Sequence, residues 1–196
     1  MVNTRGISLF IVVLMMSFLL SATGYGAVFN VTNPTAFQNA LTTAESNGQD
    51  DTINVAAGTY NITTTLTCNP GASENHALNI VGAGVDSTVL DGGSSVQLLY
   101  IRIWSLSDTN AHISISGITF KNGNSSDDGG ALWVKTYYAN ITVQNSEFSG
   151  NTASMGGGAY ADSSYGAVTL INNTFSGNSA SHSGGGAYAD SSYGAV

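Results

Sequence analysis

Few residues of this 196-residue chain could carry out chemistry, because only 8% of them are charged. Two pairs of adjacent carboxylates, Asp50-Asp51 and Asp127-Asp128, come closest to a glycosidase site, which needs two carboxylates flanking the scissile bond. The first pair follows a helix-ending turn and the second lies in a Ser-Gly turn. We therefore favour solvated turns for both pairs and keep a catalytic pair as the alternative.

The histidines and the single cysteine do not resemble a metal or nucleophile site. His76, His112 and His182 fall at unequal positions of the repeats defined below, so they form no column of ligands. Cys68 cannot form an internal disulfide, and no nucleophile motif surrounds it and His76. We interpret Cys68 as a small buried thiol, assign no catalytic or metal-binding residue, and expect no cofactor.

One further pair of carboxylates recurs at equal repeat positions. Asp162 and Asp190 would stack in neighbouring units and could bind a cation weakly. A surface row of carboxylates is the favoured interpretation.

The first 27 residues have the pattern of a secretory signal peptide. Arg5 precedes an apolar run over residues 7–20, and small residues follow over 21–27. The run is too short to span a bilayer comfortably, so we expect cleavage between Ala22 and Ala27 and keep an uncleaved anchor helix as the alternative. Residues 28–196 would then form one exported domain without a transmembrane span.

The exported part is acidic. Three strong bases stand against twelve carboxylates, a net charge of about −9. Such a surface repels phosphates, so we expect no nucleic-acid partner, and it fits a polyanionic glycan poorly. Acidity of this kind keeps an exported protein soluble.

Three repeated units fill the second half of the chain, over residues 113–140, 141–167 and 168–195. The segment GGGAYADSSYGAV occurs at 156–168 and again, letter for letter, at 184–196. A fixed period of this length is typical of stacked repeats. Because Val196 would begin a fourth unit, we expect the array to be truncated at its C-terminal end.

Each unit opens with alternating β-branched or aliphatic residues and has a phenylalanine seven residues later, which predicts short strands. The intervening residues are turn formers, and no unit contains a helical run. The sequence therefore predicts an all-β, single-stranded parallel β-helix whose coils stack about 4.8 Å apart. Stacking would place Phe120, Phe148 and Phe175 in one column.

Glycine pairs and asparagines recur in the same units. Gly129-Gly130, Gly157-Gly158 and Gly185-Gly186 are expected at a sharp corner that needs positive φ or close backbone approach. Asn151 and Asn178 are expected to hydrogen-bond between coils. Upstream, residues 33–48 predict a short N-terminal capping helix, with Asn33 as its N-cap and Gly48 at its end.

Four tyrosines also recur in register. We expect Tyr160 and Tyr188 to lie in the core and Tyr165 and Tyr193 to be exposed. Exposed rings in register would suit sugar rings or a protein partner, so Tyr165 and Tyr193 are the candidate ligand-binding residues.

The repeats resemble those of the chlamydial polymorphic outer membrane protein family. The resemblance rests on Gly-Gly-Ala followed by a large residue, and on Phe-x-x-Asn, in which Gly123 replaces the asparagine of the first unit. The matching motif residues are Gly129, Gly130, Ala131, Gly157, Gly158, Ala159, Gly185, Gly186, Ala187, Phe120, Phe148, Asn151, Phe175 and Asn178. The segment from Phe37 to Gly93 is similar to the N-terminal part of right-handed, pectin-lyase-like β-helices.

The resemblance implies a passenger at the cell outer membrane, on the cell surface or outside the cell, often adhesive. A region beyond Val196 would then supply any outer-membrane association. Two hypotheses follow for function. The first is a non-enzymatic protein that binds a glycan or a host or neighbour surface protein. The second is a polysaccharide lyase or glycoside hydrolase whose site is degenerate here or lies in missing coils.

Overall fold

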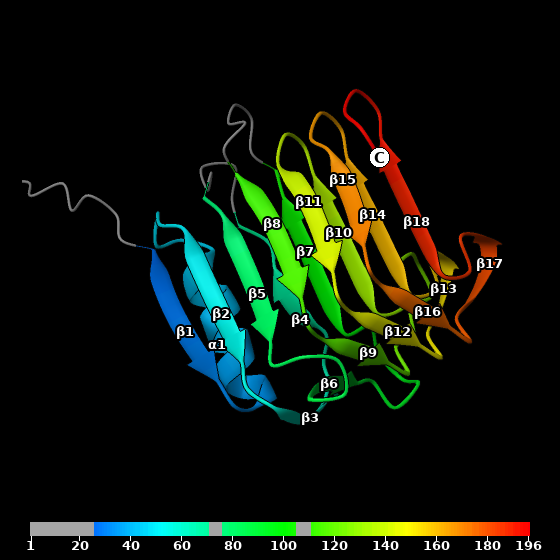
Figure 1. The fold of residues 1–196 in the computed structure, drawn as a ribbon, viewed down its shortest axis with the longest axis horizontal. Helices are drawn as coiled ribbons and strands as arrows, with labels where there is room; N and C mark the ends of the chain where they lie inside the picture. The colour runs from blue at the N-terminus through cyan, green and yellow to red at the C-terminus, as the bar shows by residue number, and fades with distance from the viewer. Residues whose placement is uncertain (1–25, 71–75, 105–110) are drawn as a thin grey trace, which may run out of the picture.

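The computed structural model describes residues 26–70, 76–104 and 111–196. Over these residues, one helix and eighteen strands wind into a single stack of coils (Figure 1). The signal peptide expected at residues 1–27 lies outside the described residues, apart from Gly26 and Ala27. Ala27 is the first residue of strand β1.

Three parallel sheets form the walls of the stack. The first sheet contains β1 (Ala27–Val31), β2 (Asp51–Val55), β5 (Leu78–Gly82), β8 (His112–Ser116), β11 (Asn140–Gln144) and β15 (Val168–Ile171). The second contains β3 (Gly58–Asn61), β6 (Thr88–Asp91), β9 (Thr119–Lys121), β12 (Glu147–Ser149) and β16 (Thr174–Ser176). The third contains β4 (Leu66–Cys68), β7 (Leu99–Ile103), β10 (Leu132–Thr136), β14 (Ala159–Ser163) and β18 (Ala187–Ser191). A small fourth sheet pairs β13 (Thr152–Met155) with β17 (Ser179–Ser183).

The path of the chain through these sheets defines the fold. From β2 onward, each coil passes once through the first, second and third sheets, and each coil is named after its strand in the first sheet. In Figure 1 the first sheet runs downward in front and the third runs upward behind it, while successive coils advance from left to right. The molecule is therefore a right-handed, single-stranded parallel β-helix, which confirms the predicted fold class.

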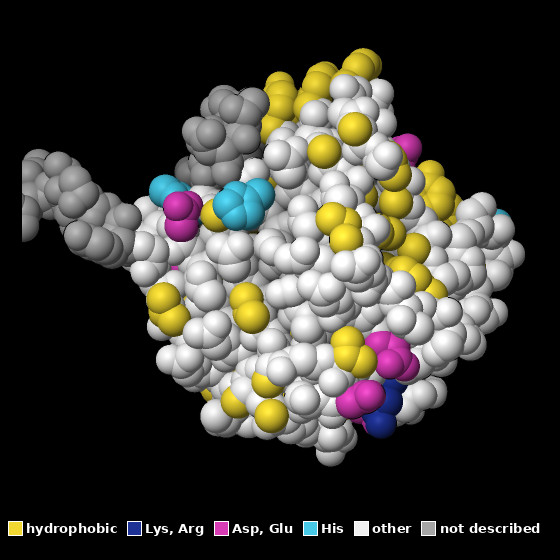
Figure 2. All heavy atoms as spheres, in the orientation of Figure 1, with side chains coloured by type: hydrophobic (Ala, Val, Ile, Leu, Met, Phe, Trp, Pro, Cys, Tyr) yellow, Lys and Arg dark blue, Asp and Glu magenta, His cyan; other side chains and the backbone are white. Residues whose placement is uncertain are grey.

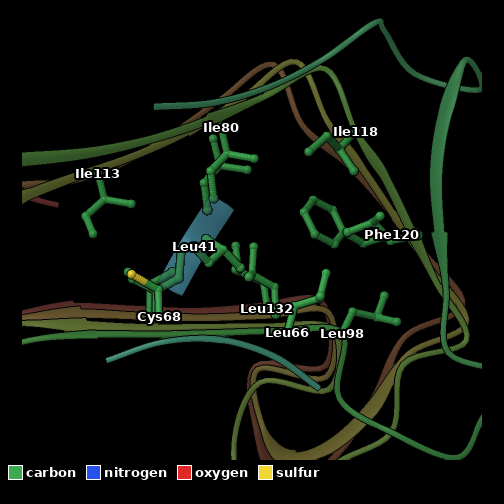
Figure 3. Packing of buried hydrophobic residues seen from close by; sticks show 14 of the residues in the cluster. Leu41, Leu66, Cys68, Ile80, Leu98, Ile113, Ile118, Phe120 and Leu132 are labelled. Carbon is green, nitrogen blue, oxygen red and sulfur yellow. The ribbon is translucent and has the colours of Figure 1, made fainter. Parts of the chain in front are cut away.

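The interior is filled by columns of like side chains, one from each coil (Figure 3). Ile141 lies opposite Ile113 in β8 and Val168 in β15. The ring of Phe148 lies 4.8 Å from that of Phe120 and 4.9 Å from that of Phe175, and both pairs are nearly parallel. Apolar burial is favourable by about 25 cal/mol per Å², so these columns supply most of the force that holds coil on coil.

Helix α1 (Pro34–Ala44) covers the open end of the stack. Asn33 accepts a hydrogen bond from the backbone N–H of Ala36, as an N-cap does. The buried face of the helix consists of Phe37, Ala40, Leu41 and Ala44, the four residues that the sequence places on one side. The helix ends at Ala44, four residues before Gly48, and in the turn that follows the Asn47 side chain accepts a hydrogen bond from the Gln49 N–H and donates one to Asp51.

Asparagine side chains tie each coil to the one before it. Asn151 accepts a hydrogen bond from the Gly123 N–H (2.6 Å) and donates one to the Phe120 carbonyl (3.0 Å). Asn178 repeats both bonds one coil later, with Asn151 (3.0 Å) and Phe148 (2.8 Å). Gly123, which takes the place of asparagine in the first unit, begins this row and contributes only its backbone N–H as a donor to Asn151.

The glycine corners are present, but the first repeat aligns one residue differently from the sequence alignment. Leu132 lies opposite Ala159, so Gly129 corresponds to Gly156 rather than to Gly157. Gly129, Gly156 and Gly184 all have positive φ. Their successors Gly130, Gly157 and Gly185 are the second glycines of the corner, and a Cβ added at Gly130 or Gly157 would collide with a carbonyl oxygen of the next coil. The segment from the phenylalanine to the corner is one residue longer before Gly129 than before Gly156. A count from the phenylalanines therefore aligns Gly129 with Gly157, although the structure aligns it with Gly156.

Candidate functional site

A ridge of exposed and half-buried aromatic side chains follows the turns that leave the third sheet. Its members are Trp104, Tyr137, Tyr138, Tyr165 and Tyr193. Figure 2 shows apolar side chains gathered along this upper edge, over the turns after β10, β14 and β18. We call this set the aromatic ridge.

The repeated letters SSYG explain how the ridge is built. At the end of β14 the Ser163 hydroxyl accepts a hydrogen bond from the Gly166 N–H (2.9 Å) and donates one to the Ala139 carbonyl (3.1 Å). Ser191 makes the equivalent pair of bonds with Gly194 and Gly166 one coil later. Gly166 must lack a side chain, because a Cβ there would collide with the Ala139 carbonyl oxygen. Each serine thus folds the turn that presents the tyrosine between it and the glycine.

The ridge rings form a continuous stack. The ring centroids of Tyr165 and Tyr193 are 4.8 Å apart with an interplanar angle of 11°, and those of Tyr138 and Tyr165 are 4.9 Å apart at 22°. Tyr137 meets Tyr165 edge-on at 5.1 Å and lies 5.7 Å from Trp104. The rings therefore hold one another in place before any partner arrives.

Exposure and charge distinguish the ridge from the core. Trp104 is 38% exposed, Tyr165 42% and Tyr193 75%. A hydrogen bond with Tyr137 raises the pKa of Tyr165 above its usual value, so its phenol stays neutral and can donate. The Arg102 guanidinium lies 5.0 Å from the centre of the Trp104 ring and adds one positive charge beside the ridge.

A second aromatic row crosses the outer face of the third sheet, and it corrects one expectation. Tyr160 and Tyr188 are not core residues. They lie outside the coil, because Ala159 and Ala161 take the inward positions of β14. The row continues through Tyr100, Trp133, Tyr160 and Tyr188 with ring spacings of 4.4, 5.9 and 5.1 Å, all nearly parallel.

Tyr160 is only 8% exposed even though it faces outward, because Trp133 and Tyr188 cover its two faces. Burial and the Asp162 carboxylate raise its pKa, and its hydroxyl lies 3.3 Å from that carboxylate. Since ring faces in this row cover one another, the row offers a ligand mainly ring edges.

Beside this row, Asp162 lies opposite Asp190, as the repeat register predicts. Asp162 is already engaged, because Lys135 of the preceding coil lies 2.6 Å from one of its carboxylate oxygens. A neighbouring lysine opposes cation binding at this carboxylate. Over residues 26–70, 76–104 and 111–196, no three histidine, cysteine, aspartate or glutamate residues come together as metal ligands could.

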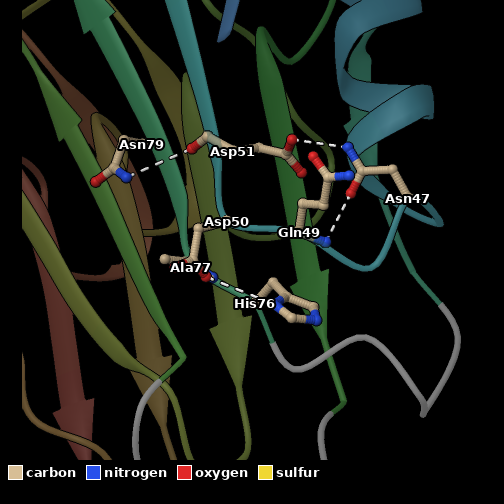
Figure 4. A network of polar contacts seen from close by, with 7 residues as sticks. All are labelled: Asn47, Gln49, Asp50, Asp51, His76, Ala77 and Asn79. Atoms are coloured by element: carbon tan, nitrogen blue, oxygen red, sulfur yellow. Dashed lines mark hydrogen bonds and ion pairs between the residues drawn. The ribbon is translucent and has the colours of Figure 1, made fainter. Parts of the chain in front are cut away.

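The solvated turn expected for the Asp50-Asp51 pair holds for Asp50 but not for Asp51 (Figure 4). Asp50 is exposed, lies 3.5 Å from His76, and accepts a hydrogen bond from the Ala77 N–H. Asp51, by contrast, is buried and accepts a 2.8 Å hydrogen bond from Asn47. It occupies an inward position of β2, and burial raises its pKa. The alternation Asp-x-Ile-x-Val over residues 51–55 was the signal for this burial.

The Asp127-Asp128 pair lies on the loop between β9 and β10. Together with Gln97, Tyr100, Ser125 and Trp133 it lines an open groove of about 380 Å³. Two carboxylates and two rings thus share one concavity. Of the remaining candidates, Cys68 is buried in β4, His112 lies on β8, and His182 lies on β17 beside Ser154 (3.1 Å).

Comparison with known proteins gives one match. Residues 174–190 match the family described as the Chlamydia polymorphic membrane protein (Chlamydia_PMP) repeat. The matched segment runs from β16 to β18 and contains Phe175, Asn178 and the Gly184-Gly185 corner. No curated protein and no solved structure gives a match. The chain is thus a parallel β-solenoid with a repeat similar to those of the polymorphic membrane proteins.

In the described part of the chain, none of the helices has the length and apolar character needed to cross a membrane.

Proposed function

We propose that this protein is an exported, non-enzymatic β-solenoid passenger, displayed at the cell surface or outer membrane, that binds a surface protein or glycan through its aromatic ridge. The observation that carries the proposal is the stack of the half-buried Tyr138 with the exposed Tyr165 and Tyr193 across three successive coils. The similarity of residues 174–190 to a polymorphic membrane protein repeat supports the surface location.

The ridge has the physical properties of a contact surface. Tyrosine and tryptophan bury large areas on binding, and a buried phenol finds a hydrogen-bond partner. The ridge rings are held by their neighbours, so ordering them on binding costs less entropy than ordering free side chains. A solenoid also presents its turns in a straight row, which suits an extended partner.

Export is supported by the signal-peptide pattern of residues 1–27, and the way the coils are held permits it. Stacked columns and asparagine bonds stabilise the coils without a disulfide between them, since the chain has one cysteine. Such a fold is independent of the redox state of its compartment.

A partner screen tests the proposal. The mature chain is applied to a glycan panel and to intact cells, and bound protein is quantified for the wild type and for Tyr165→Ala/Tyr193→Ala. We expect the double variant to lose binding. Ile171→Ala is the matched control, because Ile171 is 43% exposed but lies outside the ridge, and it should bind as the wild type does. Equal binding by the double variant and the wild type would refute the ridge as the contact surface.

A carbohydrate-active enzyme is the second candidate, and one observation favours it. Asp127 and Asp128 line a groove with Tyr100 and Trp133, a combination that could hold a sugar between carboxylates and rings. The same glycan panel, scored for reducing ends or unsaturated products, separates the candidates. Cleavage that disappears in Asp127→Asn/Asp128→Asn would establish the enzyme and displace the first proposal.

A further inference from the structure

We propose that Tyr165 and Tyr193 are a site of oxidative cross-linking, at which a dityrosine bond joins the β11 coil to the β15 coil. This modification is separate from partner binding and does not depend on it. It concerns what the ridge tyrosines do to one another when an oxidant reaches them.

The geometry brings two equivalent phenols together. Tyr165 and Tyr193 occupy the same position of two identical turns, with ring centroids 4.8 Å apart and planes 11° from parallel. The Tyr193 N–H donates a hydrogen bond to the Ser164 carbonyl (2.9 Å), which fixes one turn on the other. The two phenol rings therefore lie nearly face to face.

An oxidant can reach the tyrosine rings that these turns present. Tyr165 has a ring neighbour on each side, Tyr138 and Tyr193, and is still 42% exposed. The chain contains its own comparison in the same two coils. Tyr160 and Tyr188 are stacked almost as closely, at 5.1 Å and 5°, but Tyr160 is only 8% exposed. The two pairs therefore match in stacking and differ in the access that a protein oxidant needs.

The reaction balances with a haem peroxidase as catalyst and hydrogen peroxide as oxidant. The peroxidase removes one electron and one proton from each phenol. The two phenoxyl radicals join through a carbon–carbon bond between their ortho ring carbons (Cε). The hydrogen on each joined carbon then moves to the oxygen of its own ring and restores the phenol. Two tyrosines and one peroxide molecule give one dityrosine and two water molecules.

The product would serve this molecule as a disulfide serves others. The chain has one cysteine, so no disulfide can join two of its coils. A bond from Tyr165 to Tyr193 closes a loop of one coil, which restricts the unfolded chain and holds neighbouring coils together. An oxidising exterior would thus strengthen the stack at its exposed edge.

The test uses the purified chain treated with limiting hydrogen peroxide and a haem peroxidase. The monomer is isolated by size-exclusion chromatography and analysed by dityrosine fluorescence, intact mass and peptide mapping. We expect the monomer to lose two hydrogen atoms and to yield one cross-linked peptide pair, joining Tyr165 to Tyr193. Amide exchange over residues 168–195 should slow after the reaction.

Two phenylalanine variants, which keep the stacked ring, complete the design. Tyr165→Phe should reduce the fluorescence of the treated monomer to background, and Tyr188→Phe should leave it at the wild-type level. Circular dichroism before oxidation verifies that both variants are folded. The proposal is overturned by a monomer without dityrosine, by product formed only between chains, or by a cross-link that joins another pair such as Tyr160 and Tyr188.

Discussion

Replacing Phe148 with alanine removes a ring that lies between two others. The side chain is fully buried, with Phe120 at 4.8 Å on one side and Phe175 at 4.9 Å on the other. A buried phenylalanine removes roughly 150 Å² from water, worth about 4 kcal/mol at 25 cal/mol per Å². Phe→Ala substitutions in cores cost about 3–5 kcal/mol. We therefore expect Phe148→Ala to lower the free energy of unfolding by about 4 kcal/mol.

Urea unfolding followed by far-ultraviolet circular dichroism measures this loss. The matched control is Tyr165→Ala, which removes a ring with a similar stacking distance but from the exposed ridge. Since this ring keeps much of its surface in water, its removal should cost only about 1 kcal/mol. A stack of coils can unfold in parts, and partial unfolding would change the slope of the unfolding free energy against urea concentration. The comparison therefore requires the same slope in the wild type and both variants. Equal losses in the two variants would refute the assignment of one ring to the core and the other to the surface.

Three further predictions concern the polar and glycine positions. Asn151→Ala should cost about 2–4 kcal/mol in urea unfolding, because two buried backbone groups lose their partner, and more than Asn178→Ala, whose site is half exposed; equal costs would contradict this. Gly129→Ala should destabilise by more than the ~1 kcal/mol expected of Gly177→Ala, since both have positive φ but only Gly129 lacks space for a Cβ; the two unfolding midpoints measure the difference. Because burial raises the pKa of Asp51, its contribution to stability is complete below about pH 4 and is lost as the pH rises through the folded pKa. The free energy of unfolding of Asp51→Asn, relative to that of the wild type, should therefore increase between about pH 4 and neutrality. A difference between the two proteins that does not change with pH would contradict this reasoning.

The repeat register was the part of the fold most accessible from the sequence. Phe120, Phe148 and Phe175 follow the opening of their units by the same number of residues, so their column follows from counting. The capping helix was equally accessible, because Asn33 and Pro34 mark its start by local chemistry. Both features can be recognised from short segments of the sequence, without knowing the fold.

Tyr160 was expected in the core, and the alignment of the first repeat was one residue out. The shared letters Gly-Gly-Ala align Leu132 with Tyr160. The structure pairs Leu132 with Ala159 and Trp133 with Tyr160. In a strand, a shift of one residue moves every side chain to the other face. The aromatic Trp133, one position later, was the signal that could have corrected the alignment.

The candidate surface was only partly accessible. The repeat indicates Tyr165 and Tyr193, and both are exposed. Tyr137, Tyr138 and Trp104 were missed because they lie at the same turn of coils whose sequences differ. The turns after β10 and β14, each closed by a hydroxyl at the end of its strand, bring Tyr137 and Tyr138 beside the repeated tyrosines. The fold thus adds to the aromatic ridge residues that the repeated sequence does not identify.

The identity of residues 156–168 and 184–196 can now be explained position by position. Ala159 and Ala161 face inward, at the positions that Leu132 and Val134 occupy in the preceding coil. Except for Gly185, the glycines of these segments have a positive φ or close contacts at the position that a Cβ would take. The two serines that end β14 and β18 close the turns. Tyr165 has none of these constraints, because its ring points into solvent and its removal leaves no cavity. Because the fold needs this turn but not the ring that it presents, the ridge, rather than the core or the corners, is the surface on which function should be sought.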